Sequence, residues 1–239
     1  MGSGTFYNSV SGVNIRTIEK VDYSLGKGMN AGLVVGKMFN KNIGVEIGVS
    51  YLFGGHLELS HNEYDTITKL IYNSRLDYTS RMLKFDPSII IATDNEKTNL
   101  YVKFGLIFGL GSIIIEENDW TKNNTMSYIT KYNGGMAFGT NASIGLLHKL
   151  SRYTSFYTEI SIANVSYAPT KGEVTSFILN GVDRLGSLSM YDKQIKFVDT
   201  FSYNPNAKPM YYEPQTALKQ KYPFGSICFS IGIRHNFYW

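Results

Sequence analysis

The sequence predicts an all-β protein, specifically an antiparallel up-and-down transmembrane β-barrel, on three observations. Seven segments alternate between large apolar residues and small or polar ones, which is the two-residue period of a β-strand. The residues opposite the apolar ones mix glycine with isolated charges, which suits the narrow polar interior of a small membrane barrel better than the close-packed core of a soluble barrel. Short turns also alternate with long polar loops, as they do in outer-membrane barrels.

Each predicted strand follows from its own alternation, and its direction follows from the connection after it. In the second strand, Val45 and Ile47 oppose Glu46 and Gly48. The last strand alternates from Ile227 onward and ends on an aromatic residue, which is typical of the closing strand of a membrane barrel. The seven strands are 29–39, 43–53, 82–92, 99–111, 135–149, 155–167 and 227–239, the first descending and each later one reversing direction.

The connections divide into two kinds. The segments 40–42, 94–98 and 151–154 are tight turns of Asn, Asp, Lys, Ser and Thr, the residues that favour turns. We expect these turns on the periplasmic side. The segments 54–80, 112–132 and 168–222 are long and rich in Tyr, Asn, Ser and Thr, and we expect them to be extracellular loops. Residues 1–239 are therefore predicted to form one barrel domain.

An even-stranded barrel requires an eighth strand, because the first and last of the seven strands both descend and cannot pair antiparallel. The candidate is Gly4 to Val10, which is short and polar. The start Met1-Gly-Ser-Gly has neither the basic residues nor the apolar run of a signal peptide. Either the chain is processed or engineered, or it begins inside the first strand, with residues 11–26 as the first outer loop. We favour the second interpretation, and we expect the natural gene product to begin upstream with a signal peptide and a strand of about ten residues.

Composition excludes other classes of protein without identifying this one. The 239 residues carry a net charge of +4 that is scattered, with no basic run of the kind that binds nucleic acid. No segment reaches the roughly 18 consecutive apolar residues of a membrane-spanning helix. The single cysteine, Cys228, excludes an internal disulfide.

Four segments carry a resemblance to a known group of proteins. They are GKGMNAGLVVGKMFNKNIGVEIGVSYLFGG (26–55), NLYVKFGLIFGLGS (99–112), KYNGGMAFGTNASIGL (131–146) and LKQKYPFGSICFSIGIRHNFYW (218–239). The chain resembles the OmpA-like superfamily of outer-membrane β-barrels, in particular small eight-stranded barrels without a peptidoglycan-binding domain. The resemblance implies integral location in a bacterial outer membrane, in contact with the bilayer and lipopolysaccharide. It also implies that the C-terminal strand is read by the barrel-assembly machinery, although Trp239 stands where such barrels usually carry Phe.

A set of charged residues is predicted to point into the lumen. Glu46, Lys103 and Glu159 lie a few residues above their turns, and Arg234 lies at a similar distance above the C-terminus. Lys84 and Asp86 share this face somewhat further up. Two acids and two bases at one level predict a neutralised network, since uncompensated charges there would be costly. A gate or selectivity ring is the functional reading, but eight strands enclose little more than side chains, so we favour a structural plug.

The opposite register predicts the surface that meets lipid. Large apolar residues fill it in every strand; the predicted lipid-facing set is Ile43, Val45, Ile47, Val49, Phe104, Leu106, Phe229, Ile231 and Ile233. Aromatic residues near the strand ends predict girdles at the two membrane interfaces. The predicted interfacial set is Phe39, Tyr51, Phe53, Phe156, Tyr167, Phe237 and Trp239.

No catalytic, cofactor or metal site is predicted. His56, Glu58, His61 and Glu63 lie together, but their spacing matches no standard metal site, and solvated loop polarity is the better reading. We found no nucleophile placed beside a histidine and a carboxylate. The sequence thus predicts a non-enzymatic barrel whose long loops, chiefly 168–222, have a recognition or surface-structural role. A narrow channel for small solutes is the first alternative and a membrane-embedded surface enzyme is the second. The sequence does not identify what the loops bind.

Overall fold

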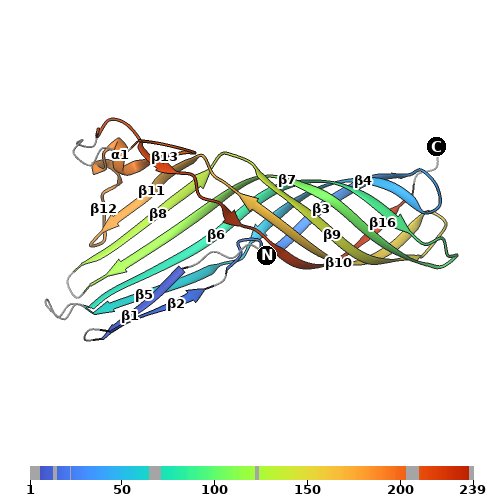
Figure 1. Ribbon diagram of the computed structural model, residues 1–239, viewed down its shortest axis with the longest axis horizontal. Helices are drawn as coiled ribbons and strands as arrows, with labels where there is room; N and C mark the ends of the chain where they lie inside the picture. The colour runs from blue at the N-terminus through green and yellow to red at the C-terminus, as the bar shows by residue number, and fades with distance from the viewer. Residues whose placement is uncertain are drawn as a thin grey trace.

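The fold is all-β, with one mostly antiparallel sheet and one short helix in the described part of the chain. The computed structural model describes residues 6–12, 15–21, 23–64, 71–121, 124–202 and 210–236. Figure 1 shows a rolled bundle of long strands at one end and a spreading sheet at the other. None of the helices in these residues is long and apolar enough to cross a membrane.

Seven strands make up the rolled region, and each pairs antiparallel with the next. They match the seven segments that alternation predicts, with different ends. They are β3 (Gly28–Met38), β4 (Ile43–Gly54), β6 (Ile71–Ala92), β7 (Thr98–Trp120), β9 (Ala137–Lys149), β10 (Thr154–Tyr167) and β16 (Ser226–His235). Residues 237–239 of the last predicted strand lie outside the described residues.

The end of the sheet with the tight turns, here called the turn end, is formed by side chains that satisfy the backbone locally. Asn40 Oδ1 accepts hydrogen bonds from the N–H groups of Asn42 and Ile43, at 2.8 and 2.7 Å. Ser151 Oγ accepts from the N–H of Thr154 at 3.1 Å. Such local bonds explain why Asn and Ser lie where the chain reverses.

At the opposite end of the sheet, here called the flared end, the prediction of long loops is wrong. Much of 54–80, 112–132 and 168–222 is strand. The parts of β6 and β7 that are farther from the turn end continue the sheet, and further elements pair with them (Figure 1). These are β5 (Leu57–Tyr64), β8 (Thr125–Asn133), β11 (Lys171–Leu179), β12 (Val182–Asp183), η1 (Leu185–Ser187), α1 (Met190–Lys193), β13 (Gln194–Val198), β14 (Gln215–Leu218) and β15 (Tyr222–Pro223). Tyr and Thr, taken as loop residues, favour strands when one of their faces is covered.

The N-terminal strands do not supply the missing eighth strand. The strand β1 (Phe6–Gly12) pairs with β2 (Ile15–Val21) and, at one position, with β5 at the flared end. Gly4 and Thr5 lie outside the described residues. The alternative in which Gly4 to Val10 closes a barrel is therefore wrong for its described part, and β2 lies where the first outer loop was expected. Among the described residues no ladder joins β3 to β16, so the sheet is not closed.

The sheet is nevertheless strongly rolled. From β4 to β16 the pairing order takes five steps, which in a flat sheet spans roughly 24 Å at about 4.8 Å per step. Yet Arg234 Nη1 on β16 lies 3.4 Å from Glu46 Oε1 on β4. The face that carries these two side chains is therefore concave, and the other face is convex.

Candidate functional site: charges on the concave face

Four charged side chains meet on the concave face of the rolled region. Lys103 Nζ on β7 lies 2.9 Å from Glu46 Oε2 and 2.9 Å from Glu159 Oε2, so this ammonium bridges β4 and β10. Arg234 contacts the other oxygen of Glu46. The side chain of Glu46 is 7% exposed and that of Glu159 14%. The structure thus brings together the four residues that the sequence placed at one level, here called the concave network, and their formal charges cancel.

Two tyrosines that sequence reasoning missed complete this network. The Tyr101 hydroxyl donates to Glu159 Oε2 at 2.9 Å, the same oxygen that Lys103 contacts. Lys103 Nζ also lies 5.0 Å from the ring centroid of Tyr101 and 6.0 Å from that of Tyr157. An ammonium above an aromatic face is attracted by the ring quadrupole, so the rings compensate part of the lost hydration. Tyr101 and Tyr157 share the register of Lys103 and Glu159, and that parity was the available signal.

Glycines on neighbouring strands make room for these rings. A Cβ on Gly145 would lie 2.4 Å from the Tyr101 hydroxyl, and a Cβ on Gly232 would lie 2.5 Å from the Tyr157 ring. Gly145 and Gly232 therefore mark spaces that are already filled by a tyrosine ring from the adjacent strand. Together with the ion pairs, they leave a packed concave interior at this level.

Lys84 and Asp86 do not belong to the concave network. The ion pairs of the described residues include none between them, and Asp86 Oδ2 instead accepts from Ser50 Oγ at 3.3 Å. Both side chains are half-buried on the same face of β6. The sequence placed them correctly on the concave face, somewhat further from the turn end.

A second cluster fills the concave face toward the flared end, and it is apolar. Leu52, Met82, Ile107 and Ile113 are buried there with the aromatic side chains of neighbouring strands. The set also includes Leu25, Leu59, Tyr78, Ala137, Val165, Tyr167, Tyr222 and Phe224. This cluster, here called the concave core, covers the concave network from the flared side.

Tyr167 belongs to the concave core, so its assignment to an interfacial girdle is wrong. Its side chain is fully buried, and its hydroxyl donates to the carbonyls of Gly111 and Gly134 at 2.6 and 2.7 Å. Of the other predicted girdle residues, Phe39, Phe53 and Phe156 are exposed and Tyr51 is half-buried. Phe237 and Trp239 lie outside the described residues.

The convex face changes from polar to apolar along a line across neighbouring strands. Arg81 on β6 pairs with Ser112 on β7, and one two-residue step toward the turn end Leu83 pairs with Leu110. From that line to the turns, Thr140 on β9 and Thr158 on β10 interrupt a convex surface that otherwise consists mostly of apolar residues, and many of the large ones are exposed. All nine predicted lipid-facing residues are among them, from Val45 at 38% exposed to Ile233 at 73%. The concave face has the opposite order, polar toward the turn end and apolar toward the flared end.

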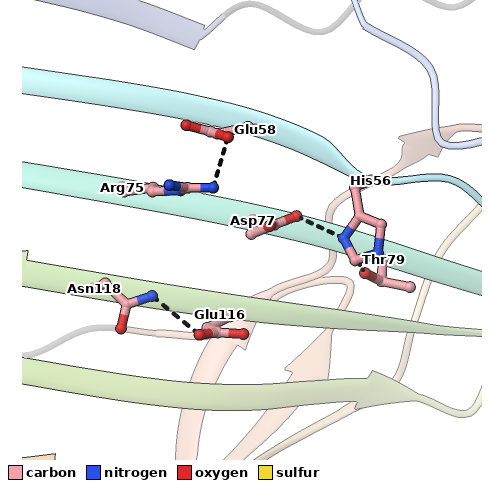
Figure 2. A network of polar contacts seen from close by, with 7 residues as sticks. All are labelled: His56, Glu58, Arg75, Asp77, Thr79, Glu116 and Asn118. Atoms are coloured by element: carbon pink, nitrogen blue, oxygen red, sulfur yellow. Dashed lines mark hydrogen bonds and ion pairs between the residues drawn. The ribbon is translucent and has the colours of Figure 1, made fainter.

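Beyond that line the convex face carries a polar network (Figure 2). His56 Nδ1 lies 3.2 Å from Asp77 Oδ1 and 3.4 Å from the Thr79 hydroxyl, while Arg75 contacts Glu58 at 2.7 Å. The carboxylate and the hydroxyl approach the same ring nitrogen of His56. A catalytic relay needs one nitrogen for each, so this arrangement is not a nucleophile, base and acid in series. No group of three or more potential metal-binding side chains occurs in the part of the chain that the structure describes.

Comparison with known proteins gives no match, whether to models of protein families, to curated proteins or to solved structures.

Proposed function

We propose that the protein is an integral β-barrel of a bacterial outer membrane, without enzymatic activity, whose flared end has a recognition or structural role at the cell surface. In this proposal the convex face contacts lipid and the concave network plugs the lumen. Lipopolysaccharide surrounds the outer half, and the barrel-assembly machinery recognises the C-terminal strand. The resemblance to OmpA-like barrels supports this location.

The opposite distribution of polar and apolar residues on the two faces is the observation that carries the proposal. Toward the turn end the convex face is mostly apolar and the concave face is polar, and toward the flared end this order is reversed. Exposing a belt of Ile, Leu and Phe side chains to water would be unfavourable. Large exposed apolar patches mark contact with a membrane or with a partner protein. On β6 the belt runs from Leu83 to Ile91, about 27 Å along the strand at ~3.4 Å per residue. At a tilt of about 40° that is roughly 20 Å, close to the ~25 Å apolar band of membrane barrels.

The packed interior favours a plug over the alternative of a solute channel. Along the axis a solute would first meet the concave core, whose members Met82, Ile113 and Tyr167 are nearly fully buried. It would then meet the ion pairs around Lys103. A buried charge that loses its partner destabilises the protein by about 3–5 kcal/mol, so the ion pairs hold the plug closed.

The flared end supports the proposed surface role because exposed aromatic and methionine side chains lie in the segments beside its sheet. Phe201, Met210, Tyr211 and Tyr212 are all exposed there, and the backbone N–H of Met190 on α1 donates to the carbonyl of Tyr211 at 3.0 Å. Tyrosine and methionine are common in binding surfaces.

Reconstitution of the purified chain into lipid vesicles tests the proposal. We expect protease added outside to cut only the flared end, at exposed segments such as 199–202, and to spare the turns 40–42, 94–98 and 151–154. In planar bilayers we expect no regular conductance steps. Regular steps would instead favour the channel, and full digestion in vesicles would contradict membrane insertion.

A further inference from the structure

The two edge strands of the rolled region lie together at the flared end and stay unpaired toward the turn end. Just before β3, the N–H of Leu25 donates to the carbonyl of Pro223 at 2.9 Å, and the Ser24 hydroxyl donates to that of Gly225. From these contacts β3 and β16 both run toward the turn end. Within the described residues β3 pairs only with β4, and β16 pairs only with β10 and no other strand. We call the interval between them the seam.

Side-chain exposure shows that the described chain does not cover the β3 side of the seam. Every residue of β3 from Gly28 to Lys37 is exposed, in both registers. Val34, in the concave register, is 53% exposed. On β4, one strand away, the concave residues Glu46 and Gly48 are buried.

The directions of the two edges determine what can pair with both. This step rests on the proposed function, because only in hydrocarbon are free backbone N–H and C=O groups intolerable. Both edges run from the flared end to the turn end, so an antiparallel partner must run from the turn end to the flared end. A second copy in the same membrane orientation offers only edges that run the wrong way. Of the described N-terminal strands, β1 pairs with β2 and β5, and β2 has a charged residue in each register of its sequence, as Arg16 and Glu19 show.

Part of the concave side beneath the seam is already occupied. Glu46 leans over Gly36 of β3, where a Cβ would lie 2.6 Å from Glu46 Cγ, and Tyr157 leans over Gly232 of β16. The ion pair of Arg234 with Glu46 links β16 to β4 and so passes under the seam. A strand placed in the seam therefore needs small residues on its concave side, whereas its convex side continues the apolar belt.

We propose that the seam binds one strand of another polypeptide by β-augmentation. The bound strand has about ten residues, the length of a membrane-crossing strand. It runs from the turn end to the flared end and pairs with β3 and β16 at once. Its convex residues are Leu, Ile, Val or Phe, and its concave residues are Gly, Ala or Ser.

Cysteine cross-linking in vesicles with a synthetic peptide of this pattern tests the proposal. The peptide carries one cysteine at a central convex position, and the protein carries Cys228→Ser with either Leu33→Cys on β3 or Ile231→Cys on β16. We expect disulfide formation with both variants, at least tenfold above a matched Val49→Cys control. Val49 pairs opposite Leu33 but lies on β4, which has neighbours on both sides. A scrambled peptide is expected to react no more than this control.

Four results would overturn the proposal. A direct disulfide in the Leu33→Cys/Ile231→Cys double variant without peptide would mean that β3 and β16 pair with each other. A disulfide between two copies of one single variant would mean that a second copy fills the seam. Equal reaction at Val49→Cys would mean that the peptide binds the belt without pairing. If the protein inserts into vesicles and the peptide does not react, only the seam proposal fails; if it does not insert, the proposed function fails.

Discussion

Replacing Lys103 by methionine is the most informative perturbation of the concave network. The substitution keeps most of the side-chain volume and removes the charge that lies 2.9 Å from Glu46 and 2.9 Å from Glu159. The two carboxylate oxygens are then less than about 6 Å apart, and their repulsion is roughly 3 kcal/mol at an effective dielectric constant of 20. Since breaking a buried ion pair typically costs about 3–5 kcal/mol, we expect the free energy of unfolding to fall by that amount.

Urea unfolding in detergent micelles, followed by fluorescence, measures this loss. Lys84→Met is the matched control, since it makes the same substitution on the same face without breaking an ion pair, and its loss should be less than half as large. Adding Glu159→Gln to Lys103→Met removes one of the two facing charges, keeps the pair of Glu46 with Arg234, and should restore more than half of the lost stability. A Lys103→Met protein within about 0.5 kcal/mol of the wild type, or no rescue by Glu159→Gln, would refute the reasoning.

Three other predictions follow from the two faces and the flared end. Arginine at Ile47 or Phe104 on the convex belt should lower the free energy of unfolding in vesicles by about 2–4 kcal/mol, whereas Ser50→Ala should cost much less; equal losses on both faces would contradict the assignment of the convex face to lipid. Gly145→Ala should displace the Tyr101 ring and cost about 1–3 kcal/mol in the same urea assay, with Gly186→Ala, which meets no neighbour, as the neutral control. At the flared end, burial and the neighbouring Asp119 raise the pKa of Glu117. The folded state therefore binds the proton of this carboxyl more tightly than the unfolded state does. Its contribution to stability is fully present below the unfolded pKa and is lost as pH rises through the folded pKa. Glu117→Gln should therefore be more stable than the wild type at pH 7 and no more stable below about pH 4; a difference that does not change with pH would show that Glu117 is not burdened by its charge.

Alternation predicted the strands because successive side chains of a strand point to opposite faces of the sheet. Every second residue therefore has to suit the surroundings of one face. The Ile227–Ile233 register and its polar complement are both visible in the sequence, and so is the level of Glu46, Lys103, Glu159 and Arg234 above the turns. The same parity also assigns Tyr101 and Tyr167 to the concave face, since they share the registers of Lys103 and Glu159. Tyr167 was placed in a girdle by its distance from the strand end, where parity was the stronger signal.

The flared end could not be predicted from hydropathy because its strands are covered by aromatic and polar residues. The stacked pair Tyr128 and Phe177, with centroids 4.4 Å apart, joins β8 to β11 across segments that read as loops. Register between such segments depends on contacts between residues far apart in sequence, which composition does not reveal. The open seam likewise depends on the partner of β3, and no pattern within β3 identifies it. The prediction of a strand encoded upstream stays a prediction; such a strand would fill the seam from the same chain, in place of the strand of another polypeptide proposed above.

The accessibility of successive residues on β7 tests the central claim, that the convex face lies in lipid, most directly. Nitroxide labels are attached to single cysteines from 104 to 110 in the Cys228→Ser protein reconstituted in vesicles, and their collisions with oxygen and with a water-soluble nickel complex are measured. We predict that oxygen accessibility alternates, high at 104, 106, 108 and 110 and low at 105, 107 and 109, with the nickel complex excluded from the even positions. Equal accessibility of both registers, or free access of the nickel complex to Phe104 and Leu106, would contradict the account.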